Sequence, residues 1–580
     1  MILPHRALIL AAILTVSAFA ESISGAGLKN PSGSRSQPNF LMISVDDLND
    51  WVGFLKGHPL VQTPHLDRLA RESVIFTHAY CAAPVCGPSR AAVFTGLGPT
   101  STGMYSNANR LQTVYPDARF FHQRLAEHGY HTIGTGKLLH GNQGGPETFD
   151  EYGPGFNKWN PLTKEETVIT KAELQDSIPF VRHRVSRPDG FELVLPLNQM
   201  PRDRNRGSKR IESFDWGPIN RPESEWSDTR CADWAIEQIG KAHSKPFFLG
   251  LGFYRPHQPL WAPKKYYDLY PPDRIQIPNH LESDLNDVPF IGKLIGRTPL
   301  TSGAHSTVVA HNQWRNAISS YLACISFVDT QIGRVIEALD ASPHSANTIV
   351  VLWSDHGWHL GEKEHWGKFT AWERSARVPL LIRLPKHYES SGFRPTVHEG
   401  PVSLLDLSPT ILELAKVPQS GRRDGISLVP ALLGNETVSG RIVSTSVGPG
   451  NHSLRDDRWR FIQYYDGSQE LYDLDTDPEE RTNLATNPRF HVTMKRFQKA
   501  LPRDHRISHF VRLNEWKAIV QAGDQPIKLF GPGVHNVDGS PDVARSHPEI
   551  VHQVKTFLAA NPNAPRHSSL PTNSKGTEGR

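Results

Sequence analysis

Cysteine is scarce in this sequence. The chain has 580 residues but only four cysteines, Cys81, Cys86, Cys231 and Cys324. Small exported domains that depend on disulfide bonds carry many more cysteines for their length. The sequence therefore excludes a disulfide-built scaffold, and its stability must come from a large hydrophobic core.

Net charge is also small. The 63 lysines and arginines are nearly balanced by 59 aspartates and glutamates, which leaves a formal charge of +4. A nucleic-acid-binding protein usually concentrates basic residues in one patch or stripe. The sequence therefore gives no support for a nucleic-acid partner.

Long apolar runs are missing, with one exception at the N-terminus. Arg6 precedes an apolar run from Ala7 to Val16, and Ala18-Phe19-Ala20 has the small-x-small pattern of a signal-peptide cleavage site. This run is shorter than the roughly 20 residues that a membrane-spanning helix needs. We predict a signal peptide over residues 1–20, export to the periplasm or the outside, and no membrane span in the mature chain.

The length and the 38% hydrophobic content predict a globular protein with more than one domain. Residues 21–37 are rich in Gly, Ser and Pro, which indicates a flexible lead-in, and residues 561–580 indicate a disordered tail. Between them we predict a main domain over 38–435 and a smaller α+β domain over 436–560.

Short apolar runs bounded by polar turns recur through the main domain and are typical of the buried strands of a largely parallel sheet. Helical patterns lie between them, so we expect an α/β sheet covered by helices on both faces. The expected strands are Phe40–Val45, Phe247–Phe253, Thr348–Trp353 and Val378–Leu384, and the expected helices are Leu66–Ser73, Ala232–Ile239 and Tyr321–Leu339. The smaller domain should contain antiparallel strands at Arg441–Val447, Trp459–Tyr465 and Glu470–Leu474.

Polar residues follow three of the expected strands directly. They are Asp46-Asp47, Arg255-Pro256-His257 and Ser354-Asp355-His356. Ligands of such sheets gather at the carboxyl ends of the strands, so these groups should converge. Asp46, Asp47 and Asp355 would then supply three oxygen donors, which suits a hard divalent cation such as Ca²⁺ or Mg²⁺. A lone Asp would more often be a helix cap or a surface residue.

A second pattern is Cys86-Gly87-Pro88-Ser89-Arg90, followed by Thr95-Gly96. A Gly-Pro turn would expose the cysteine, and a short helix from about Ser89 would direct its N-terminal amides and Arg90 at an approaching anion. The alternative is a buried cysteine in a tight turn. The pattern resembles the C-x-P-S-R-x-x-x-x-T-G signature of the sulfatase family, in which a separate maturation enzyme converts this cysteine to formylglycine.

The resemblance extends over nearly the whole mature chain and is most specific for the iduronate-2-sulfatase branch of that family. The histidine loop Phe253–Pro259 matches that of the branch, and the second metal motif Ser354–Trp358, continuing to Lys368, matches without a gap. Further matches are Val45–Leu48, Thr63–Leu69, Gly136–His140, Glu470–Leu474, Asp477–Glu480 and Asn483-Leu484.

This resemblance implies the alkaline-phosphatase-like sulfatase fold, with a large, mostly parallel sheet between helices and a smaller C-terminal domain that contains an antiparallel sheet. The implied metal ligands are Asp46, Asp47, the modified Cys86, Asp355 and His356. The implied cofactor is Ca²⁺, with Mg²⁺ as the alternative, although an imidazole ligand is less usual for calcium.

The resemblance and the charge of the reaction together suggest a role for each remaining residue. The sulfate oxygens gather negative charge, so Arg90, Lys137 and Lys368 are expected around them. His257 is the expected general acid for the departing alcohol, and His140 the expected base for sulfate release. Taken alone, His257 would be read as a turn residue and His140 as a surface residue.

We therefore predict an exported sulfatase that acts on sulfated carbohydrate, most like enzymes that remove a 2-O-sulfate from a uronic acid. Two alternatives stay open: a phosphatase or phosphonate hydrolase of the same superfamily, and a carbohydrate-binding relative without catalysis. The basic stretch at about 150–225 is a solvated loop or, less in keeping with its pattern, a wall for a polyanion. Trp358, His359, Glu362, His365 and Trp366 are either a sugar-binding rim or packing around the site.

Overall fold

The computed structural model describes residues 37–141, 144–169, 182–203, 210–278, 284–299, 302–435, 438–502, 507–513, 516–521, 528–530, 544–560 and 567–569. The predicted signal peptide and all of the lead-in except Gln37 lie outside the described residues. From Pro38 onward the chain forms one compact unit. The predicted boundary at residue 435 therefore stays a prediction.

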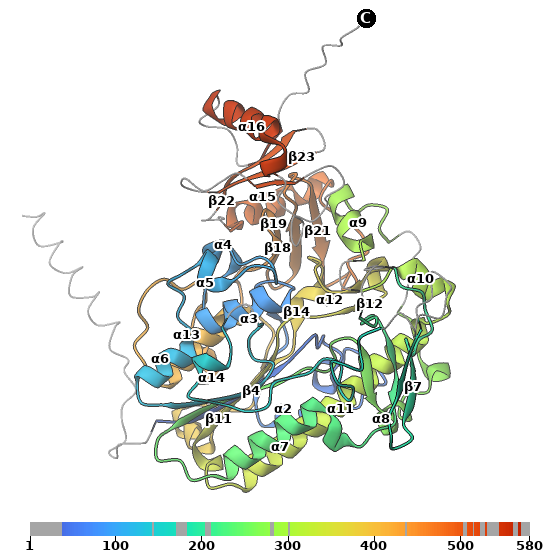
Figure 1. Cartoon of the computed structure of the whole chain (residues 1–580). Coiled ribbons are helices and arrows are strands. Elements are labelled where there is room, and N and C mark those ends of the chain that lie inside the picture. Colours follow the sequence, from blue (N-terminus) through green and yellow to red (C-terminus); the bar gives the residue numbers. More distant parts are fainter. Residues whose placement is uncertain are drawn as a thin grey trace, which may run out of the picture. The chain divides into compact units, whose positions relative to one another are not determined.

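An eight-stranded sheet forms the centre of this unit (Figure 1). Seven of its strands point the same way, and β15 alone runs opposite, which confirms the predicted, largely parallel sheet. In spatial order the strands are β16 (Thr396–His398), β2 (Val74–Phe76), β15 (Leu380–Arg383), β11 (Thr348–Ser354), β1 (Asn39–Val45), β9 (Phe247–Phe253), β4 (His131–Gly136) and β5 (Glu151–Tyr152).

The register of the central strands aligns their carboxyl ends. Val45 at the end of β1 pairs with Ser354 of β11 on one side and with Phe253 of β9 on the other. On the far side of β9, Gly136 of β4 pairs with Gly252. Every residue that directly follows one of these four strands therefore emerges at the same edge of the sheet.

Helices cover both faces of the sheet, as predicted. One core joins alternate residues such as Leu41 and Ile43 of β1 to one set of helices, and the other core joins Phe40 and Met42 to a second set. This alternation is the period of a strand buried on both sides. The first face carries α2 (Pro64–Arg71), α7 (Ser227–Gly240) and α11 (Trp314–Ala341), and the second carries α3 (Cys86–Thr95), α6 (Phe121–Glu127), α13 (Leu407–Leu414) and α14 (Val429–Leu432) (Figure 1).

The fourth expected strand is interrupted. Instead of one strand over Val378–Leu384, the chain forms β14 (Arg377–Val378) and the antiparallel β15, separated by Pro379. Proline has no N–H for a strand ladder, so the run changes partners at this residue. As a result β14 pairs with β3 (Ala79–Tyr80) and not with the central sheet.

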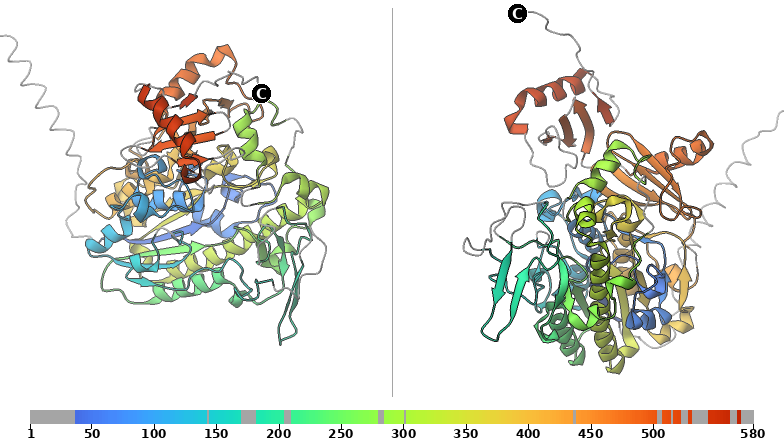
Figure 2. Two further views of the ribbon diagram at one scale, coloured as in Figure 1. Left: turned by 45° about the horizontal axis from the view of Figure 1, so that its top comes forward. Right: turned by 90° about the vertical axis from the view of Figure 1, so that its right-hand side faces the viewer.

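An antiparallel four-stranded sheet follows, as expected for the C-terminal region (Figure 2). Leu454, Phe461 and Leu471 on its face pack with Met494 and Phe497 of helix α15 (His491–Ala500). The strands are β18 (Val443–Gly448), β19 (Asn451–Arg455), β20 (Trp459–Gln463) and β21 (Gln469–Asp473). The sequence analysis missed β19 because its residues are mostly polar, although all five are buried.

The last described elements include β25 (His567–Ser569), which lies in the segment predicted to be disordered. It pairs with β22 (Ile507–Leu513). Main-chain pairing with a strand edge does not need an apolar sequence, so composition gave no sign of it. The remaining elements of this sheet are β23 (Trp516–Gln521) and β24 (Lys528–Phe530), followed in the chain by α16 (Pro548–Ala560). Among the described helices, none combines the length and the apolar character needed to cross a bilayer.

The other short elements lie around the central layers. They are α4 (Pro99–Thr102), α5 (Leu111–Val114), β6 (His183–Ser186), β7 (Glu192–Leu195), β8 (Trp216–Ile219), β10 (Leu260–Pro263), α8 (Lys264–Tyr267), α9 (Phe290–Arg297), α10 (His305–Ala310), β12 (His359–Leu360), β13 (Trp366–Gly367), α12 (Glu373–Ala376) and β17 (Val402–Ser403).

Candidate active site

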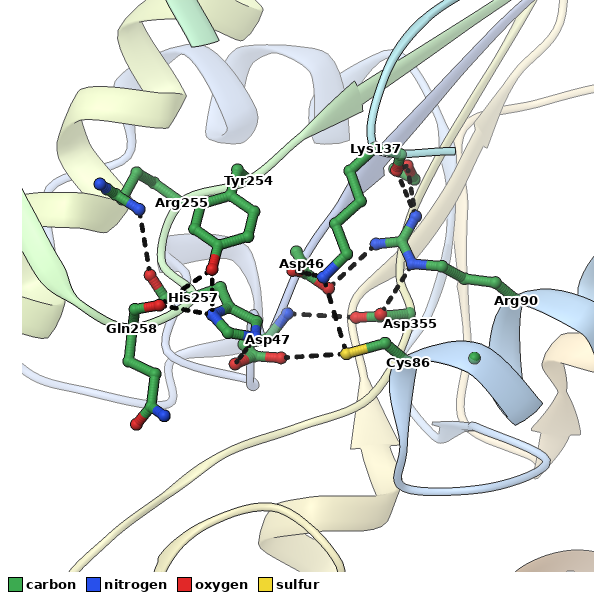
Figure 3. Close-up of polar contacts among 12 residues, drawn as sticks. Asp46, Asp47, Cys86, Arg90, Lys137, Tyr254, Arg255, His257, Gln258 and Asp355 are labelled. Carbon is green, nitrogen blue, oxygen red and sulfur yellow. Dashed lines mark hydrogen bonds and ion pairs between the residues drawn. The ribbon is translucent and has the colours of Figure 1, made fainter. Parts of the chain in front are cut away.

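The residues that the sequence analysis selected lie at the carboxyl edge of the central sheet. Figure 3 shows Asp46, Asp47, Cys86, Arg90, Lys137, His257 and Asp355 together there. Each follows a strand or lies in a helix, so regular structure fixes where its main chain emerges. Asp46 and Asp47 follow β1, Lys137 and His140 follow β4, His257 follows β9, Asp355 and His356 follow β11, Lys368 follows β13, and Cys86 and Arg90 lie in α3.

Asp47 occupies a sharp turn after β1. Its φ is +63°, in the left-handed region that a residue with a side chain rarely adopts. Its N–H donates to Asp355 Oδ1 at 3.1 Å, and its carbonyl accepts a hydrogen bond from the Tyr321 hydroxyl at 2.7 Å. These two contacts, one from the residue after β11 and one from α11, hold the turn from which Asp46 and Asp47 enter the site.

Cys86 lies at the centre of this group and is 1% exposed. It is the first residue of α3, so the helix begins three residues earlier than predicted. Lys368 Nζ lies 2.8 Å from its Sγ, His356 Nε2 3.3 Å and Lys137 Nζ 3.7 Å. Burial, followed by the charge of Asp46, raises the pKa of this thiol, so an unmodified Cys86 would be a protonated, weak nucleophile.

Four side chains of the site could hold a cation. One ligand atom from each of Asp46, Asp47, Cys86 and His356 lies within 4.8 Å of the others. Asp47 Oδ2 is buried and makes no hydrogen bond, and burial raises the pKa of Asp47 to about 8. Lys368 alone does not offset the cost of burying this carboxylate beside Asp46, so the residues fit a divalent cation.

The orientation of His356 supports the same conclusion. Its Nδ1 lies 3.0 Å from the carbonyl of Gly357, which can only accept a hydrogen bond, so Nδ1 carries the proton. The lone pair of Nε2 then faces Asp47 Oδ1 at 3.4 Å and Cys86 Sγ at 3.3 Å. Fixing the tautomer through the other ring nitrogen is the usual arrangement of a metal-binding histidine.

Both carboxylate oxygens of Asp355 already accept hydrogen bonds from the protein. Its Oδ2 accepts from Arg90 Nε at 2.9 Å, and its Oδ1 accepts from the N–H groups of Asp47 and His356. Burial would raise the pKa of Asp355, but Arg90, His356 and Lys137 together hold it well below its usual value. Asp355 is therefore ionised, and its role as a metal ligand stays a prediction.

Arg90 lies behind the carboxylates and is fully buried. Its N–H groups donate to Asp355, to Asp46 Oδ1 at 3.2 Å and to the carbonyls of Lys137 and Leu138. The arrangement makes Arg90 the countercharge of Asp46 and Asp355. A direct contact between Arg90 and sulfate, which the motif suggested, stays a prediction.

Two lysines flank Cys86. Lys368 Nζ lies 2.8 Å from Asp47 Oδ1, and Lys137 forms an ion pair with Asp46. Both lysines are nearly inaccessible to solvent. Burial would lower the pKa of Lys368, but the charges of Asp47, Cys86, Asp46 and Asp355 together outweigh it and raise that pKa, so the ammonium stays charged. Positive charge is thus fixed on two sides of residue 86.

His257 faces the site through Nε2, which lies 3.7 Å from Asp47 Oδ2. Its Nδ1 lies 2.7 Å from both the Tyr254 hydroxyl and the carbonyl of Gln258. Burial, then Lys368 and Lys137, lowers the pKa of His257 well below its usual value. The free enzyme therefore holds this imidazole neutral at pH 7.

His140 is partly buried, and its Nδ1 makes no hydrogen bond. Burial, then Lys137, lowers its pKa to about 4, so His140 is also neutral at pH 7 and able to accept a proton. Lys137, Lys368 and Arg90 lower this pKa and Asp46 raises it, so His140 lies within reach of their charges. The structure thus brings all the predicted side chains to one place.

Two open alternatives of the sequence analysis can now be compared with the structure. Trp358, His359, His365 and Trp366 are all buried, which supports packing around the site over an exposed sugar-binding rim. In the described part of the basic stretch, Arg184, Arg187 and Arg202 form ion pairs with Glu192, Glu166 and Glu212. Arg204, Arg206 and Lys209 lie outside the described residues.

The sequence analysis missed Tyr254 and Tyr321. Tyr254 lies in the histidine loop, three residues before His257, and its position there was the only available sign. Tyr321 lies in α11, 274 residues away from Asp47 along the chain, so nothing local could have indicated their contact.

Sequence profiles of known families match most of the described chain. The profile named Sulfatase matches residues 38–417, and the profile named N-sulphoglucosamine sulphohydrolase, C-terminal, matches residues 361–506. A sulfatase from Formosa agariphila is 36% identical over 473 residues, which cover 80% of this chain and 87% of that protein.

Two further relatives carry narrower names. A choline-sulfatase from Rhizobium meliloti is 29% identical over 493 residues, 82% of this chain and 87% of that protein. The iduronate 2-sulfatase of Mus musculus is 29% identical over 357 residues, 60% of this chain and 59% of that protein.

Solved structures confirm the expected fold. A 2-O GAG sulfatase matches with a TM-score of 0.58 at 21% identity, over 80% of this chain and 91% of that chain. The phosphonate monoester hydrolase of Silicibacter pomeroyi matches with a TM-score of 0.63 at 24% identity, over 80% of this chain and 94% of that chain. At these identities the likeness concerns the fold alone.

Proposed function

This chain belongs to the sulfatase family, and we propose that it is an exported member that removes sulfate from carbohydrate through a formylglycine at position 86. As a sulfuric ester hydrolase it must stabilise negative charge on sulfate and protonate a poor leaving group. One observation carries the proposal: Cys86 lies at the N-terminus of α3, 2.8 Å from Lys368 Nζ, among side chains suited to a divalent cation.

The surroundings of residue 86 fit attack on an anion. A bound Ca²⁺ or Mg²⁺, held by Asp46, Asp47 and His356, would lower the pKa of a hydroxyl on the modified residue and offset charge on the sulfate. Lys137 and Lys368 place two fixed ammonium groups beside the same position. Because both are buried and already oriented, they stabilise developing charge without reorganising.

His257 and His140 supply two neutral imidazoles beside these cations. Lys137 and Lys368 help to keep His257 deprotonated, and an arriving sulfate ester puts negative charge between them. Substrate binding therefore raises the pKa of His257, so that Nε2 can carry the proton that the leaving alcohol needs. His140, with a pKa near 4, is ready to accept the proton that must leave residue 86 for sulfate release.

We propose a 2-O-sulfated uronic acid, or a related unit of a sulfated polysaccharide, as the substrate. The support is the resemblance of the histidine loop and of the second metal motif to the iduronate-2-sulfatase branch, together with the relative of that name at 29% identity. The choline-sulfatase at the same identity shows that the family also includes an enzyme named for a small substrate.

The test is desulfation of a defined panel by the enzyme produced together with a formylglycine-generating enzyme. The panel holds oligosaccharides with 2-O-sulfated uronic acid at the chain end, matched 6-O-sulfated oligosaccharides, choline sulfate and a phosphonate monoester. Mass spectrometry of the peptide that carries residue 86 measures its conversion. We expect the fastest sulfate release from the 2-O-sulfated sugar.

Cys86→Ala is the control for this experiment. It should fold normally and release essentially no sulfate, because the nucleophile cannot form. A folded Cys86→Ala protein that keeps more than a few per cent of the activity would overturn the role of residue 86. Faster turnover of choline sulfate or of the phosphonate than of every sugar would overturn the carbohydrate assignment.

A further inference from the structure

Tyr254 contacts both His257 and Lys137 of the candidate active site. It is 2% exposed and directly follows β9. Its main-chain N–H donates to Asp228 Oδ1 at 2.7 Å, and the N–H of Arg255 donates to the other oxygen of the same carboxylate at 3.1 Å. The position of the Tyr254 side chain is thus set from helix α7, outside the histidine loop.

The hydroxyl of Tyr254 is part of a closed triangle with His257 and Gln258 (Figure 3). It lies 2.7 Å from His257 Nδ1 and donates to the carbonyl of Gln258 at 3.0 Å. The same carbonyl lies 2.7 Å from His257 Nδ1. A carbonyl only accepts, so Nδ1 must carry a proton, and the hydroxyl oxygen is free to accept from it as well.

This triangle determines which nitrogen of His257 does chemistry. With the Nδ1 proton committed to Gln258 and Tyr254, Nε2 is the ring atom that gains and loses a proton, and it faces the site 3.7 Å from Asp47 Oδ2. Two hydrogen bonds at one ring nitrogen also fix the rotation of the imidazole, which a single bond to the carbonyl would leave freer.

The ring of Tyr254 has a second contact, with Lys137. Lys137 Nζ lies 5.1 Å from the centroid of the Tyr254 ring and 5.5 Å from that of Phe156. The two rings are stacked, with centroids 5.2 Å apart and planes 8° apart. A cation this close to aromatic rings is attracted by their negative faces, so the Phe156–Tyr254 pair helps to hold the ammonium beside residue 86.

We propose that Tyr254 is a positioning residue that acts through two others: its hydroxyl orients His257 toward the leaving group, and its ring holds Lys137 toward the sulfate. The inference rests on the proposed function, in which His257 is the general acid and Lys137 a sulfate-binding cation. One side chain then sets the distance between His257, which faces the leaving alcohol, and Lys137, which faces the sulfate.

Two substitutions separate the two contacts. Tyr254→Phe removes the hydroxyl and keeps the ring. It should lower kcat for an alkyl sulfate about 10- to 100-fold, as expected for a misaligned catalytic group, and change kcat for an aryl sulfate less than about twofold. Tyr254→Leu removes the ring as well and should slow both substrates further, because Lys137 acts on sulfate in either case.

Tyr270→Phe is the matched control. Tyr270 is also buried but is not part of the site. Its hydroxyl shares a hydrogen bond of 2.5 Å with Ser326 Oγ and accepts one of 2.9 Å from the N–H of Gln62. It should change neither rate. Thermal unfolding of all variants shows whether any loss reflects folding, and rates are compared well below each Tm.

A double-mutant cycle that combines Tyr254→Phe with His257→Ala distinguishes this inference from the proposed function. If Tyr254 acts through His257, Tyr254→Phe should change alkyl sulfate turnover less than about twofold when His257 is already alanine. An equal loss in both backgrounds, or no loss in the native background, would overturn the inference. The general-acid role is tested separately, by whether His257→Ala alone slows turnover of alkyl sulfates more than that of aryl sulfates. The double-mutant cycle requires only that the losses of rate caused by the two substitutions are not additive.

Discussion

The hydroxyl of Tyr321, in helix α11, donates a 2.7 Å hydrogen bond to the main-chain carbonyl of Asp47. The hydroxyl oxygen of Tyr321 also accepts a 2.9 Å hydrogen bond from the N–H of Asn49. Both bonds lie on the turn in which Asp47 has a φ of +63°. A single buried hydroxyl thus supports the strained backbone on which the candidate metal site depends.

Tyr321→Phe should therefore weaken metal binding without removing any ligand. Partners behind metal ligands commonly contribute about 10- to 100-fold to affinity, and we expect a loss of about tenfold for Ca²⁺, measured by calorimetric titration. Tyr130→Phe is the matched control, because the buried Tyr130 hydroxyl makes no hydrogen bond. Equal affinities of the two variants would show that the turn does not need Tyr321.

Asp47 makes the effect of calcium on stability depend on pH. Burial favours the protonated carboxyl and raises its pKa to about 8, so this group stabilises the metal-free protein at low pH and loses that contribution as pH rises toward 8. Calcium needs the ionised form and competes with the proton. The rise in Tm on adding Ca²⁺ should therefore grow between about pH 5 and pH 8.

Asp47→Asn is the control for this pH effect. The amide is nearly isosteric and does not titrate, so the variant should show a small calcium shift that is the same at every pH. Differential scanning fluorimetry with a chelator or with excess Ca²⁺ measures both proteins. A native calcium shift that is independent of pH would contradict the assignment of Asp47 as the titrating ligand.

Arg90 should matter for stability as well as for activity. It pairs with Asp355 at 2.9 Å and with Asp46 at 3.2 Å, and all three side chains are fully buried. Removing one partner of a buried ion pair typically costs about 3–5 kcal/mol, because a charge remains without its partner. Arg90→Met should lose about this much in urea unfolding, and adding Asp355→Asn should restore part of it. A fully additive double variant would show that the pair is not coupled.

The location of the site was predictable because the sequence places its chemistry directly after buried strands. Asp46 follows the apolar run of β1, and Asp355 follows that of β11, so the parallel register had to bring them together. Cys86 was recognisable from its own motif. The order of the strands in space did not need to be known for any of these residues.

The partners of each side chain were not predictable in the same way. Arg90 is close to Cys86 in sequence, which suggested that it faces the substrate, but its carboxylate partners come from 44 and 265 residues away. The hydrogen bond of Tyr321 spans 274 residues. Such contacts depend on packing between layers, which local patterns do not encode.

The final prediction concerns the two imidazoles, which should act in opposite halves of the cycle. His257→Ala should slow alkyl sulfates about 10²-fold or more and aryl sulfates far less, because a phenolate departs without much help from an acid. The measurement is kcat for matched alkyl and aryl esters. The expectation follows from the position of Nε2, which faces the site while Nδ1 is held by Gln258.

His140→Ala should behave differently. Its pKa near 4 leaves it neutral at pH 7, the state that a base needs, and its loss should slow release of sulfate from residue 86 with either type of ester. Rapid quenching and mass spectrometry should then find the peptide that carries residue 86 heavier by one sulfate. If His257→Ala slows both esters equally and His140→Ala retains no sulfate, both histidines only bind the ground state. Lys368, 2.8 Å from the Sγ of Cys86, would then be the next candidate acid, because its ammonium lies beside residue 86 and stays charged.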